Sequence, residues 1–197
     1  MKINYKSYHE YLLKESFFGF IYRRFILYPT LKLLTGNEFL DVGCGVGIFL
    51  SFGSKKSIGL DINPYNIKKI NSNKKSKAFL INKDGTFPIK DSSISTIICD
   101  QVIEHIDDPH KILSEISRVI RKNGRIIIGL PMEKGYKSDP DHKKFYNIKT
   151  IKEITKKFQM KYTFHFYFPL FFKIFGKFFS WQYMYVILKS IKQQIYF

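Results

Sequence analysis

A glycine-rich segment that follows a predicted strand constrains the fold of this chain more than any other feature. The segment spans residues 41–47 and reads DVGCGVG, and the strand before it is predicted over residues 38–42. Because glycine has no Cβ atom, the backbone can turn sharply here and a ligand can lie against it. In sheets of parallel strands, ligands bind beyond the carboxyl ends of the strands. The segment therefore predicts a parallel sheet with a ligand-binding loop after its first strand.

Strands and helices alternate along the rest of the chain. Further strands are predicted at residues 58–62, 78–82, 95–100 and 125–130. This alternation is typical of a parallel sheet covered by helices on both faces. Residues 160–168 and 181–189 are rich in β-forming side chains and predict a closing pair of strands. The predicted fold class is α/β, a doubly wound, mostly parallel Rossmann-like sheet with a closing antiparallel strand pair at the C-terminus.

Local signals place several helix ends. Residues 7–34 are predicted to form one or two helices that end at Thr35-Gly36-Asn37. Asn63-Pro64 is predicted to open a helix, because asparagine is a good cap and proline suits the first helical position. Asp108-Pro109 opens another helix in the same way, and this helix is predicted to carry Arg121 and Lys122 in its last turn. Only 13 residues separate Gly47 from Asp61, so the first crossover helix is expected to be short.

Length and composition bound the domain organisation. A chain of 197 residues is expected to form a single domain, residues 1–197. Within it we expect a helical N-terminal cap at 1–36, a ligand-binding core at 37–157 and a basic, aromatic C-terminal segment at 158–197. The two cysteines cannot crosslink a domain of this size, and no secretory or membrane-spanning segment is recognisable, so we expect a cytoplasmic protein.

The formal net charge of +17 raises the question of nucleic-acid binding. Only five of the 33 basic residues are arginine, however, and the others are lysine. Arginine is the better residue for bidentate contacts with phosphates and bases. A lysine-rich background explains much of the charge, so specific nucleic-acid binding is not favoured.

Two details of the glycine segment distinguish between cofactor classes. The dinucleotide-binding pattern G-x-G-x-x-G requires a third glycine at position 48, where this chain has Ile48. Asp41 lies two residues before the first glycine, and a carboxylate there would repel a pyrophosphate. The same carboxylate suits a cofactor that carries an ammonium and a sulfonium group and no phosphate. These features favour S-adenosylmethionine (SAM) over NAD.

Acidic residues also follow the next two predicted strands. Asp61 ends the second strand, where a carboxylate can accept hydrogen bonds from both ribose hydroxyls of a nucleoside. Asp84 and Gly85 follow the third strand, where a carboxylate can accept from an adenine amine and a glycine N–H can reach a ring nitrogen. An acidic residue at one strand end is often only a turn residue. Glycines and acids at the ends of three successive strands together indicate a nucleoside-binding site.

With these motifs in place, residues 38–131 resemble the class I SAM-dependent methyltransferases of the small-molecule type. The resemblance places the methionine part of SAM at the glycine segment and near Gln101, and the adenine beside Ile62. It implies that the following residues bind the cofactor: Asp41, Gly43, Cys44, Gly45, Gly47, Asp61, Ile62, Asp84, Gly85 and Gln101.

Two histidines are candidate general bases for removing a proton from an acceptor hydroxyl. His105 follows the fourth strand, and the pair Glu104-His105 resembles a segment of the ubiquinone-biosynthesis O-methyltransferases. Some members of that group bind a metal with a further glutamate three residues earlier, where this chain has Gln101, so no metal is predicted. His142 lies in the loop after the fifth strand, which would overhang an acceptor. A positioning role in a loop is the alternative for each histidine.

The segment after the fourth strand also bears on the acceptor. Methyltransferases that modify amino groups of nucleic acids usually carry an Asn/Asp-Pro-Pro-aromatic segment there, whereas residues 100–103 read DQVI. The sequence therefore favours a small, glycan or lipid-linked acceptor, methylated at oxygen. An RNA methyltransferase and a SAM-binding module without catalysis remain the alternatives.

The C-terminal segment is unusually aromatic. Residues 158–197 hold 16 of the 34 aromatic residues and no acidic residue. Residues 170–179 read LFFKIFGKFF, more apolar surface than the edge of a small domain normally exposes. Aromatics flanked by lysines suit an anionic membrane surface, with contact on the cytoplasmic face as the expectation. Packing in the core or against another subunit is the alternative, and the oligomeric state is not predicted.

Overall fold

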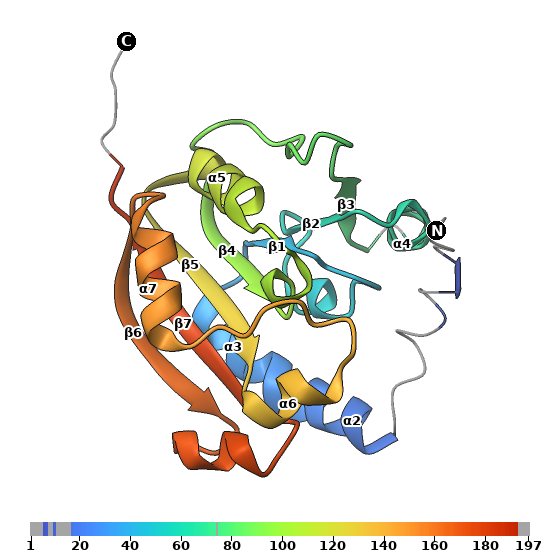
Figure 1. Cartoon of the computed structure of the whole chain (residues 1–197). Coiled ribbons are helices and arrows are strands. Elements are labelled where there is room, and N and C mark those ends of the chain that lie inside the picture. The colour runs from blue at the N-terminus through green and yellow to red at the C-terminus, as the bar shows by residue number, and fades with distance from the viewer. Residues whose placement is uncertain (1–5, 8–9, 11–16, 74, 193–197) are drawn as a thin grey trace. The chain divides into compact units, whose positions relative to one another are not determined.

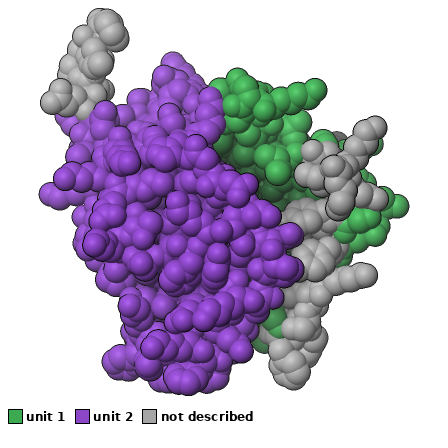
Figure 2. Space-filling model, viewed as in Figure 1, with its two compact units in different colours: residues 1–88 green, residues 89–197 purple. Residues whose placement is uncertain are grey.

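A computed structural model describes residues 6, 7, 10, 17–73 and 75–192. The predicted N-terminal helix residues 8, 9 and 11–16 lie outside this part. The chain divides into two compact units, residues 1–88 and 89–197 (Figure 2). The expected single domain remains a prediction.

The first unit holds three parallel strands, with β1 paired to β2 and β2 to β3. Its elements in chain order are α2 (Phe17–Tyr22), the π-helix η1 (Arg23–Leu27), α3 (Tyr28–Thr35), β1 (Leu40–Val42), the 3-10 helix η2 (Phe49–Phe52), β2 (Ile58–Asp61), α4 (Pro64–Ser72) and β3 (Lys77–Leu80) (Figure 1). Leu40, Val42 and Leu60 are fully buried. The three strands confirm those predicted from the first part of the sequence.

The predicted helix ends in this unit are confirmed. Helix α3 ends at Thr35 because Gly36 adopts a φ of +73°, which a glycine reaches without strain. The Asn63 side chain caps α4 by accepting hydrogen bonds from two backbone N–H groups, at 2.9 and 3.3 Å. The short crossover after the glycine loop is the single 3-10 turn η2, whose Phe49 stacks on Phe39 with ring centroids 4.8 Å apart.

The second unit pairs β4 with β5 in parallel and β5 with β7 and β7 with β6 in antiparallel. Its elements in chain order are β4 (Ile94–Asp100), the 3-10 helix η3 (Ile103–His105), α5 (His110–Val119), β5 (Ile120–Pro131), α6 (Glu133–Ser138), α7 (Ile148–Lys156), β6 (Met160–Phe168), the 3-10 helix η4 (Lys173–Lys177) and β7 (Tyr183–Ser190). Helix α7 packs against β6 (Figure 1). The α/β class, the mostly parallel strands and the closing antiparallel pair are confirmed.

The end of helix α5 differs from its prediction. The helix ends at Val119, and Arg121 and Lys122 lie in strand β5 instead of the last helical turn. Ile120 is extended, with a ψ of 136°, fully buried and paired with Ile94 of β4. Burial of this side chain in the sheet therefore overrides the helical spacing of the sequence. Asp108 accepts a hydrogen bond from the N–H of His110 at 3.0 Å, next to the predicted start of the helix.

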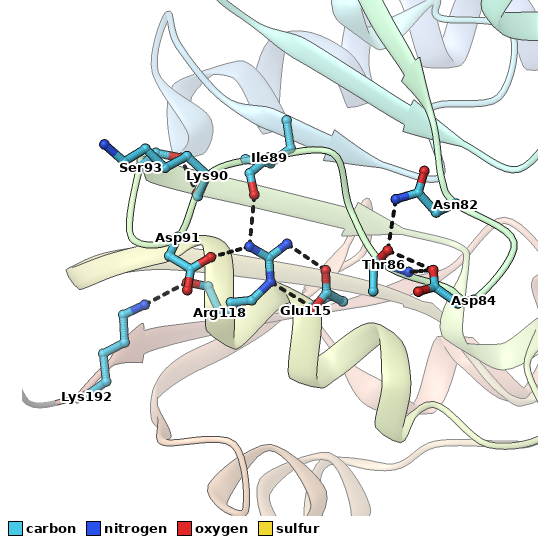
Figure 3. Close-up of polar contacts among 10 residues, drawn as sticks. All are labelled: Asn82, Asp84, Thr86, Ile89, Lys90, Asp91, Ser93, Glu115, Arg118 and Lys192. Carbon is cyan, nitrogen blue, oxygen red and sulfur yellow. Dashed lines mark hydrogen bonds and ion pairs between the residues drawn. The ribbon is translucent and has the colours of Figure 1, made fainter.

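Arg118 ties helix α5 to the segment before β4 (Figure 3). Its guanidinium donates to both carboxylate oxygens of Glu115, at 2.9 and 2.7 Å, and to the carbonyl of Ile89 at 2.9 Å. It also pairs with Asp91. Lys192 donates to the carbonyl of Arg118 at 3.0 Å, at the C-terminal end of the helix. This network fixes the start of β4 and the end of α5, the two elements that flank the loop carrying Glu104 and His105.

Candidate functional site

The glycine loop of the first unit has the geometry that the sequence predicted. Gly43, Gly45 and Gly47 have φ values of +78°, +52° and +78°. The loop is anchored to the neighbouring strand because the N–H groups of Gly43 and Cys44 both donate to the carbonyl of Leu60, at 2.8 and 2.9 Å. A Cβ atom at Gly47 would lie 2.8 Å from Ile70 of helix α4. The backbone therefore approaches α4 as only glycine allows.

Asp61 lies at the carboxyl end of β2, beside this loop. Its Oδ2 accepts from the N–H of Gly45 at 2.8 Å, and its Oδ1 accepts from the N–H of Asn63 at 2.7 Å. Burial raises the pKa of Asp61, while these hydrogen bonds oppose the rise by favouring the carboxylate. A carboxylate oxygen can accept more than one hydrogen bond. The carboxylate can thus accept hydrogen bonds from two hydroxyl groups, such as those of a ribose, and keep its hydrogen bond with the N–H of Gly45.

Three other predicted residues lie around the same strand ends. Asp41 is in β1 and is buried. Burial, aided by Asp41 and Asp61, raises the pKa of the Cys44 thiol, so Cys44 is a neutral side chain at physiological pH. Ile62 follows β2 and is 63% exposed, which leaves an apolar surface free to cover a ligand beside Asp61.

The turn after β3 gives both predicted adenine-contact residues internal partners. The N–H of Gly85 donates to the carbonyl of Asn82 at 2.8 Å, so the turn engages the amide that was expected to reach an adenine nitrogen. The Oδ1 of Asp84 accepts from the N–H of Thr86 at 3.0 Å and from its hydroxyl at 2.7 Å (Figure 3). Asp84 thus stabilises the turn through its Oδ1. The contact between Asp84 and an adenine amine remains a prediction.

Gln101, in the second unit, also has internal partners. It has a φ of +56°, and its N–H donates to the carbonyl of Gly129 at 3.1 Å. With its amide nitrogen turned toward Glu104, the side chain donates to Glu104 Oε1 at 3.3 Å and accepts from the N–H of Leu130 at 3.2 Å. The side chain predicted to meet the methionine of SAM is therefore engaged in orienting Glu104, and the predicted contact is untested.

His105 and His142 were predicted separately, and the structure brings them together. Their ring centroids lie 4.6 Å apart. The backbone explains this, because the N–H groups of Lys143 and Lys144 donate to the carbonyl of Glu104 at 2.7 and 3.1 Å. These bonds hold the loop with His142 against helix η3, which carries His105. Burial, followed by the proximity of His142, lowers the pKa of His105.

Glu104 is the residue that sequence reasoning missed. Its side chain is buried, with 1% of the residue exposed, and its Oε2 has no hydrogen-bond partner among the described residues. Burial raises the pKa of Glu104 to about 8. One potential ligand atom from each of Glu104, His105 and His142 lies within 4.8 Å of the others. The adjacent Glu104-His105 pair was visible in the sequence, but its burial and its contact with a loop some forty residues away were not.

A pocket of about 380 Å³ opens in the second unit beyond the carboxyl end of β5. It lies between the start of α6, the start of α7 and helix η4, and most of its lining is apolar or aromatic. The lining includes Met132, Phe145, Tyr146, Ile148, Tyr167, Ile174 and Met184, with Lys173, Lys177 and Glu133 as the charged members. Sequence analysis expected the loop of His142 to overhang an acceptor but did not predict helix α6 or this pocket.

Comparisons with known proteins agree with this geometry. Residues 40–128 match the family described as "Methyltransferase domain". An uncharacterised protein of Methanocaldococcus jannaschii is 31% identical over 123 residues, which are 58% of this chain and 58% of that protein. The mitochondrial ubiquinone biosynthesis O-methyltransferase of Dictyostelium discoideum is 28% identical over 113 residues, covering 48% of this chain and 35% of that protein.

Among solved structures, a chain from the complex between the Haloferax volcanii Trm112 methyltransferase activator and a putative methyltransferase has the same fold. It superposes with a TM-score of 0.73 at 12% identity, over 98% of this chain and 100% of that one. The sequence matches cover between 33% and 58% of the length of three relatives. The glycine loop, Asp61 and strands β1 to β4 lie within the residues that match the family. Residues 40–128 thus match a methyltransferase domain, and the chain is similar to the class I methyltransferases whose cofactor is S-adenosylmethionine.

Proposed function

We propose that this protein transfers a methyl group from SAM to an oxygen of a small, apolar or lipid-linked acceptor. The observation that carries the proposal is the apolar pocket of the second unit, which begins where β5 ends. Ligands of parallel sheets bind at the carboxyl ends of strands, so this is where an acceptor is expected. Its lining favours an apolar acceptor over a glycan, because sugar hydroxyls would lose their hydrogen bonds to water there.

The first unit supplies the residues proposed to hold SAM. Asp61 is positioned to accept hydrogen bonds from the two ribose hydroxyls, and Ile62 offers an apolar surface for the adenine. The positive φ values of the glycine loop keep Cβ atoms away from the methionine part, and the buried Asp41 suits a cationic cofactor. Gly43, Gly45 and Gly47 are therefore needed for backbone shape, and the two aspartates for charge.

SAM supplies a methyl group already activated by its sulfonium, so the protein has mainly to align the acceptor and exclude water. In the transfer, a bond forms between the acceptor oxygen and the methyl carbon, and the carbon–sulfur bond breaks with its electron pair left on sulfur. A hydroxyl acceptor must also lose its proton. We propose that the cluster of Glu104, His105 and His142 is where the acceptor oxygen is activated, since it lies in the loops that follow β4 and β5.

The proposed acceptor class predicts where a labelled methyl group will go. Incubating the full chain with labelled SAM and a fractionated cell extract should place label in the lipid or apolar small-molecule fraction. Ile174→Asp should reduce this transfer at least ~10-fold, because it places a charge in the apolar lining, while leaving SAM affinity unchanged. Ile191→Asp is the matched control, since Ile191 is 53% exposed and Ile174 51%, and Ile191 does not line the pocket.

Other destinations of the label would contradict the acceptor class. Label in RNA, accompanied by binding that weakens steeply with salt, would favour an RNA methyltransferase. Binding of SAM without label in any fraction would favour a SAM-binding module without catalysis. Equal transfer by the Ile174 and Ile191 variants would remove the pocket from the proposal.

The exposed aromatic residues around η4 are proposed to contact an anionic membrane. Phe171, Phe172 and Phe178 are 74%, 70% and 65% exposed, and Lys173 and Lys177 lie among them. Exposed aromatics beside lysines suit a membrane interface, where the rings enter the acyl boundary and the lysines face anionic headgroups. Among the described residues, no helix is long and apolar enough to cross a bilayer. Contact would therefore be made by this surface, next to the pocket that a lipid-linked acceptor would enter.

Liposome flotation tests this surface. The full chain should float with vesicles that contain anionic lipids, and Phe171→Ser/Phe178→Ser should reduce the bound fraction at least ~10-fold, because each buried ring contributes roughly 1.5–3 kcal/mol. Phe25→Ser/Leu33→Ser is the control, since these side chains of the first unit are 68% and 84% exposed. Equal binding by both double variants would show that charge alone attracts the protein to the vesicles.

A further inference from the structure

We propose that Tyr146 selects hydroxyl compounds in the pocket of the second unit, by holding the ligand hydroxyl between its own phenol group and the carboxyl group of Glu104. Tyr146 lies in the segment between α6 and α7 and lines the pocket, and Glu104 lies in η3. This assignment rests on the proposed function, since it concerns the same acceptor pocket. It gives a specific role to a residue that the sequence did not single out.

The burial of its lining residues orders the pocket from mouth to floor. Ile174 is half exposed, and Lys173 and Lys177 of the same helix η4 are exposed as well. Tyr146, Met132 and Met184 are all buried. Helix η4 thus borders the mouth, and Tyr146 lies at the buried end. A polar group at that end meets a ligand that has left water behind.

Two oxygen atoms at this end are buried without a partner. Tyr146 is 2% exposed, and its hydroxyl has no hydrogen-bond partner among the residues that the structure describes. The same is true of Oε2 of Glu104 within this part of the chain. Buried polar atoms of this kind are costly and rare in folded proteins. A ligand hydroxyl satisfies both, because it accepts from the phenol of Tyr146 and donates to the carboxylate of Glu104.

The backbone brings the two side chains to the same place. The N–H of Lys144 donates to the carbonyl of Glu104 at 3.1 Å, which holds the chain just before Tyr146 against η3. On the other side, Asn147 caps α7 by accepting from the N–H of Thr150 at 3.0 Å. Burial raises the pKa of Tyr146 to about 12, and the charge of Glu104 is the next cause, as expected for neighbouring side chains. Tyr146 therefore remains a protonated donor beside Glu104.

This pair of groups distinguishes an alcohol from its methyl ether. An ether oxygen can accept from Tyr146, but it has no proton to donate to the carboxylate of Glu104. One buried group would then stay without a partner, and sites built to bind a hydroxyl reject ligands that lack it for this reason. Because methylation of a hydroxyl yields an ether, the same contacts that select the acceptor would weaken the binding of its product.

Equilibrium dialysis of the full chain without SAM tests this selection. The probes are 2-naphthylmethanol, its methyl ether and 2-methylnaphthalene, at about pH 9, above the pKa of about 8 that burial gives Glu104, so that the carboxylate is the major form. The alcohol should bind at least ~10-fold more tightly than either analogue. Tyr146→Phe should lower the affinity for the alcohol about 10-fold and leave that for 2-methylnaphthalene unchanged.

Two further variants locate the effect. Tyr185→Phe is the matched control, because Tyr185 is a fully buried tyrosine of the second unit that does not line the pocket, and all three affinities should be unchanged. Ile174→Asp should weaken the binding of all three probes, because it places a charge in the lining. Without a ligand, Tyr146→Phe should not lower the midpoint of urea denaturation, since its hydroxyl has no internal hydrogen bond to lose.

Three results would contradict the selection by Tyr146. They are equal affinities of the unmodified chain for the alcohol and its ether, an unchanged preference in Tyr146→Phe, and a lowered urea midpoint in that variant, which would reveal a structural hydrogen bond. Unchanged probe binding by Ile174→Asp would place the probes outside the pocket and would also contradict it. Because no methyl transfer is measured, these results are independent of the labelling experiment that tests the proposed function.

Discussion

Asp61→Asn is expected to lower the affinity for SAM by at least ~100-fold. The carboxylate is proposed to bind both ribose hydroxyls, and charge-assisted hydrogen bonds contribute roughly 1.5–3 kcal/mol each. Losing about 3 kcal/mol corresponds to more than a hundredfold change in affinity. The substitution also places an amide NH₂ against the N–H of Gly45 or Asn63, which both donate to Asp61 at present. Calorimetric titration with SAM measures the change.

Two variants make this experiment specific. Asp91→Asn removes an equal charge from the second unit, where Asp91 pairs with Arg118, and should leave SAM affinity unchanged. Asp84→Asn should have a smaller effect than Asp61→Asn, because one Asp84 oxygen already accepts two hydrogen bonds from Thr86. If the folded Asp61→Asn protein bound SAM with the affinity of the unmodified protein, Asp61 would not be part of the cofactor site.

Gly47→Val is expected to reduce both the stability of the first unit and its affinity for SAM. A β-branched residue is strained at a φ of +78°, by about 1–2 kcal/mol. Its Cβ would also lie 2.8 Å from Ile70, and overpacking of this kind costs about 1–3 kcal/mol more. The sum predicts a loss of roughly 2–5 kcal/mol in the free energy of unfolding, measured by urea denaturation. The displaced loop should lower SAM affinity at least ~10-fold.

Gly36→Ala is the matched control for this variant. Gly36 also has a positive φ, +73°, but a Cβ there would meet no atom within 4 Å. This substitution should lower stability through the backbone strain alone and leave SAM binding intact. If Gly47→Val binds SAM as tightly as Gly36→Ala does, the glycine loop does not shape the cofactor site.

Local sequence signals predicted most of the elements because the determining interactions are short in range. The cap at Asn63, the end of α3 at Gly36 and the strand pair at residues 160–168 and 183–190 each depend on a few neighbouring residues. The prediction of where α5 ends was wrong, because that end depends on a distant residue. Ile120 continues the apolar spacing of the helix, but its pairing with Ile94 draws it into the sheet. That choice depends on a partner 26 residues away, which no local pattern contains.

The sequence by itself determined the α/β class, the glycine loop and the position of Asp61 at the end of β2, because each follows from spacing along one segment. The tertiary structure alone decided the arrangement of the side chains that are proposed to face the acceptor. His142 meets His105 where the N–H groups of Lys143 and Lys144 bind the carbonyl of Glu104, and the Glu104 side chain is buried in the same arrangement. The pocket likewise requires α6, α7 and η4 to converge beyond β5. Such features arise from contacts between distant segments, which folding brings together.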